Sequence, residues 1–228
     1  MSPPANFDRL APLYRWMELF SFGPFLERCR VAFLGEIPPC RRALILGDGD
    51  GRFTARLLRA NPNIHIHAID SSPAMLRALV RRAGPHAERV RTQIADLRTF
   101  TPSPASYDLV VTHFFLDCLT TPEIHTLAAN LRPVLAPHAL WLVSEFAVPA
   151  TPFGRLIARP LVAVLYRAFG LLTGLAIRRL PDHRAALQSA GFELLQTHSH
   201  LRGLHVAELW TLPTHSPSGI AFPAPARA

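Results

Sequence analysis

Short apolar runs alternate with amphipathic segments through residues 43–146. The run ALIL at 43–46 stops at a group of glycines, as a buried parallel strand does. The segment 52–60 that follows repeats large apolar residues on one helical face. Because strands and helices alternate with short connections, the pattern predicts a mostly parallel sheet covered by helices on both faces. We expect strands at 43–46, 64–69, 89–94, 107–112 and 139–146, and helices at 52–60, 72–82 and 122–135.

The pattern changes after residue 150, where a long apolar segment interrupts the alternation. Arg202-Gly203 has the residue types of a turn between two strands. We expect, in chain order, a long apolar helix or helical pair at 153–177, a short helix at 181–190, antiparallel strands at 192–201 and 204–212, and a disordered tail at 213–228.

The composition is that of a globular protein with a basic surface. Hydrophobic residues make up 49% of the 228 residues and charged residues 18%, which allows a sizeable core and excludes a largely disordered chain. The net charge is +8, and every basic residue other than histidine is arginine. A basic excess can indicate nucleic acid, an anionic membrane or an acidic substrate. Since the arginines are spread along the chain, a genome that prefers arginine codons explains them as well.

The cysteines and the apolar segments favour a cytoplasmic protein. Cys29, Cys40 and Cys118 lie far apart without a CxxC pair, as expected for reduced, buried thiols. The first ten residues lack the apolar core of a secretory signal. The most lipid-like stretch, 157–177, is interrupted by Arg159 and a proline, and falls short of the roughly 20 uninterrupted apolar residues of a membrane span.

The glycine loop GDGDG at 47–51 stands where the first strand ends and a helix begins. Glycines are needed there because the chain turns sharply and a ligand approaches the backbone closely. A dinucleotide site favours G-x-G-x-x-G, but here the spacing is G-x-G-x-G and Arg52 takes the place of the third glycine. Asp48 and Asp50 would also repel a pyrophosphate. The loop therefore disfavours an NAD-linked oxidoreductase and suits a cofactor with a cationic end and no phosphate, such as S-adenosylmethionine.

Two further acids follow later strands of the predicted sheet. Asp70 ends the second strand about 20 residues beyond the loop, where an acid accepts hydrogen bonds from a ribose diol. Asp96 follows the third strand and is placed to receive an adenine amino group. Both acids have a structural alternative, because Asp70 can precede a helix cap and Asp96 can cap its own loop.

Four motifs together resemble the class I S-adenosylmethionine-dependent methyltransferases, in the broad branch that includes quinone and other small-molecule methylases. They are ALILGDGDGRF, AIDSSPAML, QIADL and YDLVVTHFFLD, and the resemblance runs from Phe7 to Trp210. It implies an α/β, Rossmann-like sandwich with a mostly parallel seven-stranded sheet, a reversed last strand and an N-terminal helical cap. It also implies a methyltransferase domain at 1–212, with a helical cap at 1–40, a lid-like insertion at 153–180, and a disordered tail at 213–228.

The resemblance assigns cofactor contacts residue by residue. Gly47, Gly49 and Gly51 would approach the methionine part, Asp70 would hold the ribose, Ser71 and Met75 would flank the adenine, and Asp96 and Leu97 would line its edge. The family often carries an acid two residues before the first glycine, where this chain has Ile45. We hypothesise that Asp48 supplies that negative charge near the cofactor's ammonium group.

Candidate catalytic residues follow the fourth strand and lie near the N-terminus. His113 and Asp117 come where the transferred methyl would point, which makes His113 both a cofactor contact and a candidate base. A buried structural histidine and a capping aspartate are the alternatives. Tyr14 lies on an amphipathic N-terminal segment that in this family folds over the cofactor, and a packed core aromatic is its alternative. Glu145, Asp182 and His183 are weaker candidates, and we expect no metal site.

These observations predict methyl transfer from S-adenosylmethionine to a small, apolar molecule. An RNA methyltransferase is one alternative, although the sequence has no strip of alternating aromatic and basic residues and nucleic acid is not expected. A non-catalytic S-adenosylmethionine-binding regulatory protein is another. The apolar segment 153–177 predicts a hydrophobic acceptor or a peripheral membrane contact, and it can equally pack on the sheet. The oligomeric state stays open.

Overall fold

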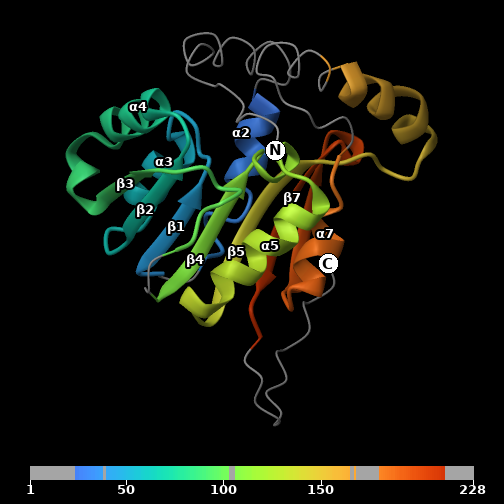
Figure 1. The fold of residues 1–228 in the computed structure, drawn as a ribbon. Helices are drawn as coiled ribbons and strands as arrows, with labels where there is room; N and C mark the ends of the chain where they lie inside the picture. The colour runs from blue at the N-terminus through green and yellow to red at the C-terminus, as the bar shows by residue number, and fades with distance from the viewer. Residues whose placement is uncertain (1–23, 38–39, 103–105, 165–166, 168–179, 214–228) are drawn as a thin grey trace.

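The computed structural model describes residues 24–37, 40–102, 106–164, 167 and 180–213. Its centre is one seven-stranded sheet (Figure 1). The strands are β1 (Arg42–Leu46), β2 (His65–Asp70), β3 (Val90–Ile94), β4 (Tyr107–His113), β5 (Leu135–Phe146), β6 (Glu193–His200) and β7 (His205–Thr211). Their order across the sheet is β3-β2-β1-β4-β5-β7-β6.

The strand pairing confirms the predicted mostly parallel sheet with a reversed last strand. Strands β1 to β5 pair in parallel, whereas β7 pairs antiparallel with both β5 and β6. The strand order reverses between β1 and β4, which are neighbours although two strands separate them in the chain. In open α/β sheets such a switch point opens a crevice at the carboxyl ends of the strands, where ligands bind. The topology therefore directs attention to the loops after β1 and β4.

Helices cover both faces of the sheet, as the alternating pattern predicts (Figure 1). The helices α2, α3 and α4 share one core cluster with the sheet, and α5 and α7 share the cluster on the other face. Their bounds are α2 (Pro24–Arg30), α3 (Arg52–Ala60), α4 (Pro73–Ala83), α5 (Thr121–Leu131) and α7 (His183–Ser189). The two clusters are built from alternate residues of the central strands, because successive side chains of a strand point to opposite faces.

The helix starts follow local chemistry that is visible in the sequence. Ser72 caps α4 by accepting a hydrogen bond from the Met75 amide at 3.2 Å, with Pro73 in the first turn. Thr120 and Glu123 form a capping box at the start of α5, and the Thr120 amide donates to Glu123 Oε2 at 2.7 Å. The Ser72-Pro73 start of α4 was expected from the sequence.

The boundary between α5 and β5 differs from the expectation of a helix to residue 135. Helix α5 ends at Leu131, a short 3₁₀ turn follows at Arg132–Val134, and β5 begins at Leu135 rather than at residue 139. Pro133 explains the earlier helix end, because a proline inside a helix removes a backbone donor and clashes with the preceding turn. Strand β5 is extended by a pairing of Leu135 with Tyr107, beyond a shift of register.

Part of the predicted insertion is described. A π-helical turn at Gly154–Ala158 continues as helix to residue 164, and its buried residues Ala158 and Val162 form a small core cluster with Leu204. Among the residues that the structure describes, no helix is long and apolar enough to cross a membrane. Tyr14, most of the predicted cap, residues 168–179 of the insertion and the tail from 214 lie outside the described residues.

Candidate cofactor-binding and active site

The glycine loop adopts the backbone that its sequence requires. Gly47, Gly49 and Gly51 have φ angles of +67°, +59° and +80°, which glycine adopts without strain. The Gly47 amide donates to the Ile69 carbonyl of β2 at 2.9 Å, so the loop starts in register with the end of the neighbouring strand.

Two of the glycines are also required by close contacts. A Cβ on Gly47 would lie 2.5 Å from Cδ2 of the Phe115 ring, which follows β4. A Cβ on Gly51 would lie 2.7 Å from the Cα atom of Leu79 in α4. Gly51 therefore serves the packing of α3 on α4, whereas Gly47 lets the loops after β1 and β4 meet at the switch point.

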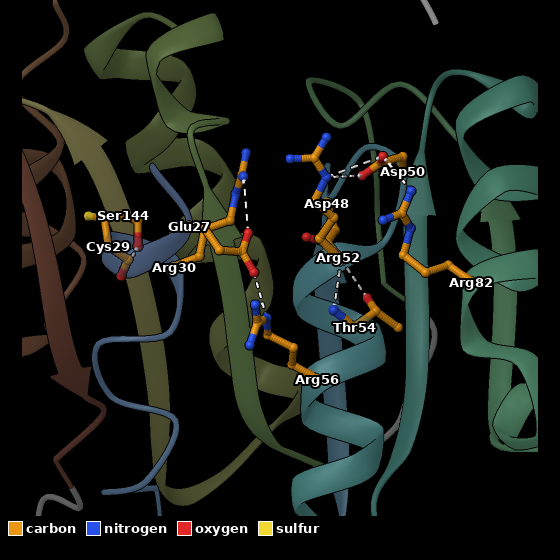
Figure 2. A network of polar contacts seen from close by, with 10 residues as sticks. All are labelled: Glu27, Cys29, Arg30, Asp48, Asp50, Arg52, Thr54, Arg56, Arg82 and Ser144. Atoms are coloured by element: carbon orange, nitrogen blue, oxygen red, sulfur yellow. Dashed lines mark hydrogen bonds and ion pairs between the residues drawn. The ribbon is translucent and has the colours of Figure 1, made fainter. Parts of the chain in front are cut away.

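The two acids of the loop have different partners (Figure 2). Asp48 Oδ2 accepts hydrogen bonds from the Thr54 amide at 3.0 Å and the Thr54 hydroxyl at 2.6 Å, so it caps the first turn of α3. Burial raises the pKa of the Asp48 carboxyl from 3.8 to about 6, against those hydrogen bonds. Asp50 instead pairs with Arg52 at 3.3 Å and with Arg82 at 2.7 Å.

Asp70 lies at the carboxyl end of β2, one strand from the glycine loop. Its Oδ1 accepts a hydrogen bond from the Ser72 amide at 2.8 Å, which directs the chain into α4. Of the residues expected to flank an adenine, Ser71 is exposed and Met75 is buried. The predicted alternative for Asp70, a position before a helix cap, is therefore present in the geometry and is compatible with ribose binding.

Asp96 and Leu97 follow β3, so they also lie at the carboxyl ends of the parallel strands. Asp96 Oδ1 accepts a hydrogen bond from the Arg98 amide at 3.0 Å, and the Asp96 side chain is 38% exposed. Leu97 is buried in the core. Asp96 thus caps its own loop and still presents part of its carboxylate at the rim.

His113 ends β4 beside Gly47, since Leu46 pairs with Thr112. The ring is 4% exposed and meets the Phe53 ring edge-on at 4.5 Å between centroids. Neither ring nitrogen has a hydrogen-bond partner among the described residues. Burial, together with the nearby charge of Arg30, holds the pKa of His113 well below its usual value. His113 is therefore neutral, with two polar atoms that a ligand can satisfy.

The loop after His113 contains Asp117 and is bound by Glu145 at the end of β5. Glu145 Oε1 accepts hydrogen bonds from the Phe115 amide at 3.1 Å and the Leu116 amide at 2.7 Å. Burial, and then the nearby Asp117 carboxylate, raise the pKa of Glu145 well above its usual value. The sequence ranked Glu145 below Asp117, because a contact across 30 residues leaves no local signal.

Arg30, near the C-terminal end of α2, is a site residue that the sequence did not single out. It is 8% exposed, its guanidinium lies 5.3 Å from the centre of the Phe114 ring, and its ion pair with Glu27 is long at 3.8 Å. Figure 2 shows Arg30 and Asp48 in the same region of polar contacts, and against the larger effect of burial the charge of Arg30 acts to lower the pKa of the Asp48 carboxyl. One arginine among many scattered ones has no distinguishing pattern in the sequence.

His183, a weaker candidate, belongs to a different cluster. The fully buried Glu208 of β7 accepts hydrogen bonds from His183 at 3.1 Å, from Arg184 at 2.6 Å and from Trp210 at 2.8 Å. Asp182 accepts from the Ala185 amide and caps α7. These contacts fasten α7 to β7 on the face away from α3. No group of three or more metal-ligating side chains occurs within the described part of the chain.

Comparisons with known proteins agree with this geometry. Residues 43–138, which contain the loop, Asp70, Asp96 and His113, match the family model described as methyltransferase domain. A malonyl-[acyl-carrier protein] O-methyltransferase of Halorhodospira halophila is 35% identical over 106 residues, covering 46% of this chain and 35% of that protein. A trans-aconitate 2-methyltransferase of Mycobacterium ulcerans is 31% identical over 156 residues, covering 66% of this chain and 56% of that protein.

The fold is found in solved structures as well. An O-methyltransferase family protein from Burkholderia thailandensis superposes with a TM-score of 0.68 at 16% identity, over 91% of this chain and 63% of that chain. The chain spans about half or less of the length of the curated relatives named above. The solved structure confirms the fold that the four motifs predict. Residues 43–138 of this chain are thus similar to the methyltransferase-domain family, and the fold around them resembles that of solved O-methyltransferases.

Proposed function

We propose that this protein transfers a methyl group from S-adenosylmethionine to a small molecule. The observation that carries the proposal is the meeting of the glycine loop, Asp70 and His113 at the carboxyl ends of β2, β1 and β4. The positive φ angles of the loop and the unsatisfied nitrogens of His113 fit a ligand that approaches the backbone closely. In this proposal residues 1–212 act as one domain, which includes the cap at 1–40 and the insertion at 153–180.

In this proposal, Gly47 and Gly49 lie against the methionine part of the cofactor and Asp70 accepts hydrogen bonds from the ribose diol. Ser71 and Met75 flank the adenine, with Asp96 and Leu97 at its edge. Asp48 faces the ammonium group, and its ionisation is favoured once that cation is present. When bound, the cofactor supplies a methyl group on a positively charged sulfur. The protein's own part is to orient the two reactants and to exclude water.

The lowered pKa of His113, which results from burial and the nearby charge of Arg30, favours an acceptor that needs no strong base. A base is required only when the acceptor must lose a proton, and the lowered pKa of His113 makes it a weak one. The named relatives act on malonyl and trans-aconitate groups, both of which are ionised acids. We therefore propose a small acceptor with an ionised oxygen, held by the positive charge of Arg30. An apolar remainder, as the sequence predicts for the acceptor, is compatible with this site.

The experiment is calorimetric titration of the full chain with S-adenosylhomocysteine and with NAD, followed by transfer of labelled methyl groups into acid metabolites. We expect saturable binding of the nucleoside and none of NAD. Asp70→Asn keeps an acceptor for the Ser72 amide, but it replaces the charged carboxylate that accepts hydrogen bonds from the two ribose hydroxyls. Since each hydrogen bond to a charged group contributes about 1.5–3 kcal/mol, the affinity falls at least about tenfold.

Asp108→Asn is the matched control for Asp70→Asn. Asp108 accepts hydrogen bonds from the Arg41 amide at 2.7 Å and the Arg42 amide at 2.9 Å. These residues lie at the amino ends of β4 and β1, at the other end of the strands from the proposed site. We expect unchanged affinity for S-adenosylhomocysteine in this variant. Equal affinity in Asp70→Asn and the wild type would contradict the site. Steeply salt-dependent RNA binding with methylated RNA as product would favour the RNA methyltransferase instead, and binding without any product would favour a regulatory protein.

We further propose that the insertion contacts an anionic membrane surface. Its helix buries Gly154, Ala158 and Val162, whereas large apolar side chains point outward. The exposed fractions are 77% for Leu156, 54% for Ile157, 39% for Leu161 and 61% for Val164. Arg155 and Arg159 are exposed on the same helix, a combination typical of helices that lie in a lipid interface.

Co-sedimentation with vesicles of phosphatidylglycerol and phosphatidylcholine tests this contact. We expect binding that is weakened by salt, lost on phosphatidylcholine alone and lost in a Leu156→Asp, Ile157→Asp double variant. Leu195→Asp is the control, because Leu195 is 50% exposed on the edge strand β6. Vesicle binding that survives the double variant would contradict the proposal. So would a change of oligomeric state or of acceptor KM without any vesicle binding.

A further inference from the structure

Glu145 is a buried acid that faces the active-site loop without belonging to the expected contacts. We infer that Glu145 is a positioning residue, whose carboxyl group holds the loop after β4 so that Phe115 lies against Gly47 in the cofactor site. The inference rests on the proposed function, because it assigns a role in that same site. In the protein without cofactor, Glu145 should hold the same loop in place.

The two hydrogen bonds join loops that are far apart in sequence. Glu145 is 1% exposed, and its Oε1 accepts from the Phe115 and Leu116 amides at 3.1 and 2.7 Å. Those amides come after His113, the last residue of β4, where hydrogen bonding to the neighbouring strands ends. The Glu145 carboxyl group takes the place of a strand carbonyl as their acceptor. Buried backbone amides need such an acceptor. Glu145 therefore fixes the direction in which the chain leaves β4.

The loop needs this support because its backbone is strained. Phe114 has a φ of +53°, a conformation that a residue with a large side chain rarely adopts. Its amide donates to the Ser144 carbonyl at 2.7 Å, immediately before Glu145 in β5. Strained residues persist where surrounding contacts over-determine them, and they gather at functional sites. Ser144 and Glu145 thus hold three successive amides, those of Phe114, Phe115 and Leu116.

The held loop shapes the site through the Phe115 ring. That ring occupies the space where a Cβ on Gly47 would lie, with its nearest atom at 2.5 Å. A loop released from Glu145 would let the ring move over the glycine loop or away from it. Either movement changes the surface that faces the methionine part of the cofactor. Asp117, the candidate catalytic acid, is carried by the same turn.

The second carboxyl oxygen indicates which substitution is conservative. Glu145 Oε2 is buried without a hydrogen-bond partner among the described residues. A neutral group is far cheaper to bury there than an ionised one, and the raised pKa of Glu145 agrees with a neutral side chain. Glutamine is neutral and keeps an oxygen that can accept hydrogen bonds from the two amides. The Glu145→Gln variant should therefore preserve the loop. Glu145→Ala removes the acceptor and leaves the amides unpaired.

The experiment measures amide hydrogen exchange of the peptide 113–118 and calorimetric affinity for S-adenosylhomocysteine in both variants. Without ligand, we expect the amide hydrogens of Phe115 and Leu116 to exchange at least tenfold faster in Glu145→Ala than in the wild type. In Glu145→Gln their exchange rates should stay within twofold of the wild type. The affinity should follow the same order, with a tenfold or larger loss only in Glu145→Ala. Glu208→Ala is the control, since Glu208 is equally buried on the neighbouring strand β7 and binds α7 instead.

The control separates local positioning from general destabilisation. Glu208→Ala should lower the unfolding midpoint without raising the exchange of the 113–118 peptide relative to the rest of the sheet. Unchanged exchange at Phe115 and Leu116 in a folded Glu145→Ala protein would overturn the inference, and so would a Glu145→Gln protein as impaired as Glu145→Ala. If the wild type bound no S-adenosylhomocysteine, the proposed function would fail, while the exchange data would still test the loop.

Discussion

Replacing Gly47 with alanine tests the contact that gives the cofactor site its shape. The new Cβ would lie 2.5 Å from Cδ2 and 2.9 Å from Cγ of Phe115, whereas packed carbon atoms are about 3.5–4.0 Å apart. The ring must therefore retreat by about 1 Å. Rotation of the side chain gives little relief, because Cβ of Phe115 lies only 3.3 Å from the new atom. The positive φ of Gly47 adds a backbone cost of about 1–2 kcal/mol for alanine.

Gly84→Ala separates the backbone cost from the contact. Gly84 has a φ of +57°, but no heavy atom lies within 4 Å of a Cβ built on it. Denaturant unfolding should show losses of about 1–3 kcal/mol in Gly84→Ala, and larger losses in Gly47→Ala. Only Gly47→Ala should lose affinity for S-adenosylhomocysteine, by about tenfold or more, since displacements of about 1 Å in a site can cost about 100-fold.

A double variant completes the test. In a Phe115→Ala background the clash with the ring is absent and only the Cβ of residue 115, at 3.3 Å, remains close. Gly47→Ala should then cost little beyond its backbone strain, and the difference between the two backgrounds measures the contact with the ring. Equal affinity for S-adenosylhomocysteine in Gly47→Ala and Gly84→Ala would mean that Phe115 does not define the surface against which the cofactor lies.

Four further predictions concern two acids, Asp48 and Glu208, whose surroundings the structure shows. The Asp48 carboxyl has a pKa of about 6 without ligand, so affinity for S-adenosylhomocysteine should rise about tenfold from pH 5 to pH 7.5 as it ionises, and calorimetry of Asp48→Asn should show a flat profile. Because the folded pKa of Asp48 is raised, the stability of the ligand-free protein should also fall as the pH rises from 3.8 to about 6, and the loss should persist above that pH. Glu208→Ala should lower the unfolding free energy by about 3 kcal/mol, because it leaves buried partners unpaired. Burial acts to raise the pKa of Glu208, but the hydrogen bonds and charges of His183 and Arg184 outweigh it and hold that pKa below 4.5. Its stabilisation should therefore be complete above pH 4.5 and be lost as the pH falls through the folded pKa. The unfolding free energies of the wild type and Glu208→Gln should differ most above pH 4.5 and converge in acid.

The features predicted from the sequence are those that local rules determine. The order of strands and helices follows from periodicity, and Ser72 and Pro73 mark a helix start by residue type. The glycine loop was recognisable because positive φ angles demand glycine at the end of a buried strand. Asp70 was found in the same way, from its place at the end of the next strand.

The features that the sequence could not give depend on contacts between distant segments. Arg30 approaches the site only because α2 lies beside the ends of the central strands, and Glu145 matters because β5 ends next to the loop after β4. The role of Gly51 in helix packing likewise depends on Leu79, which lies in another helix. The end of α5 was misplaced because the apolar pattern continues through Pro133, where the helix cannot.

A crystal structure of the full chain with S-adenosylhomocysteine would show directly where the cofactor binds. We expect the ribose hydroxyls within hydrogen-bond distance of the Asp70 carboxylate and the amino-acid part over Gly47 and Gly49, beside His113. A nucleoside bound elsewhere, or a ribose without contact to Asp70, would contradict this site.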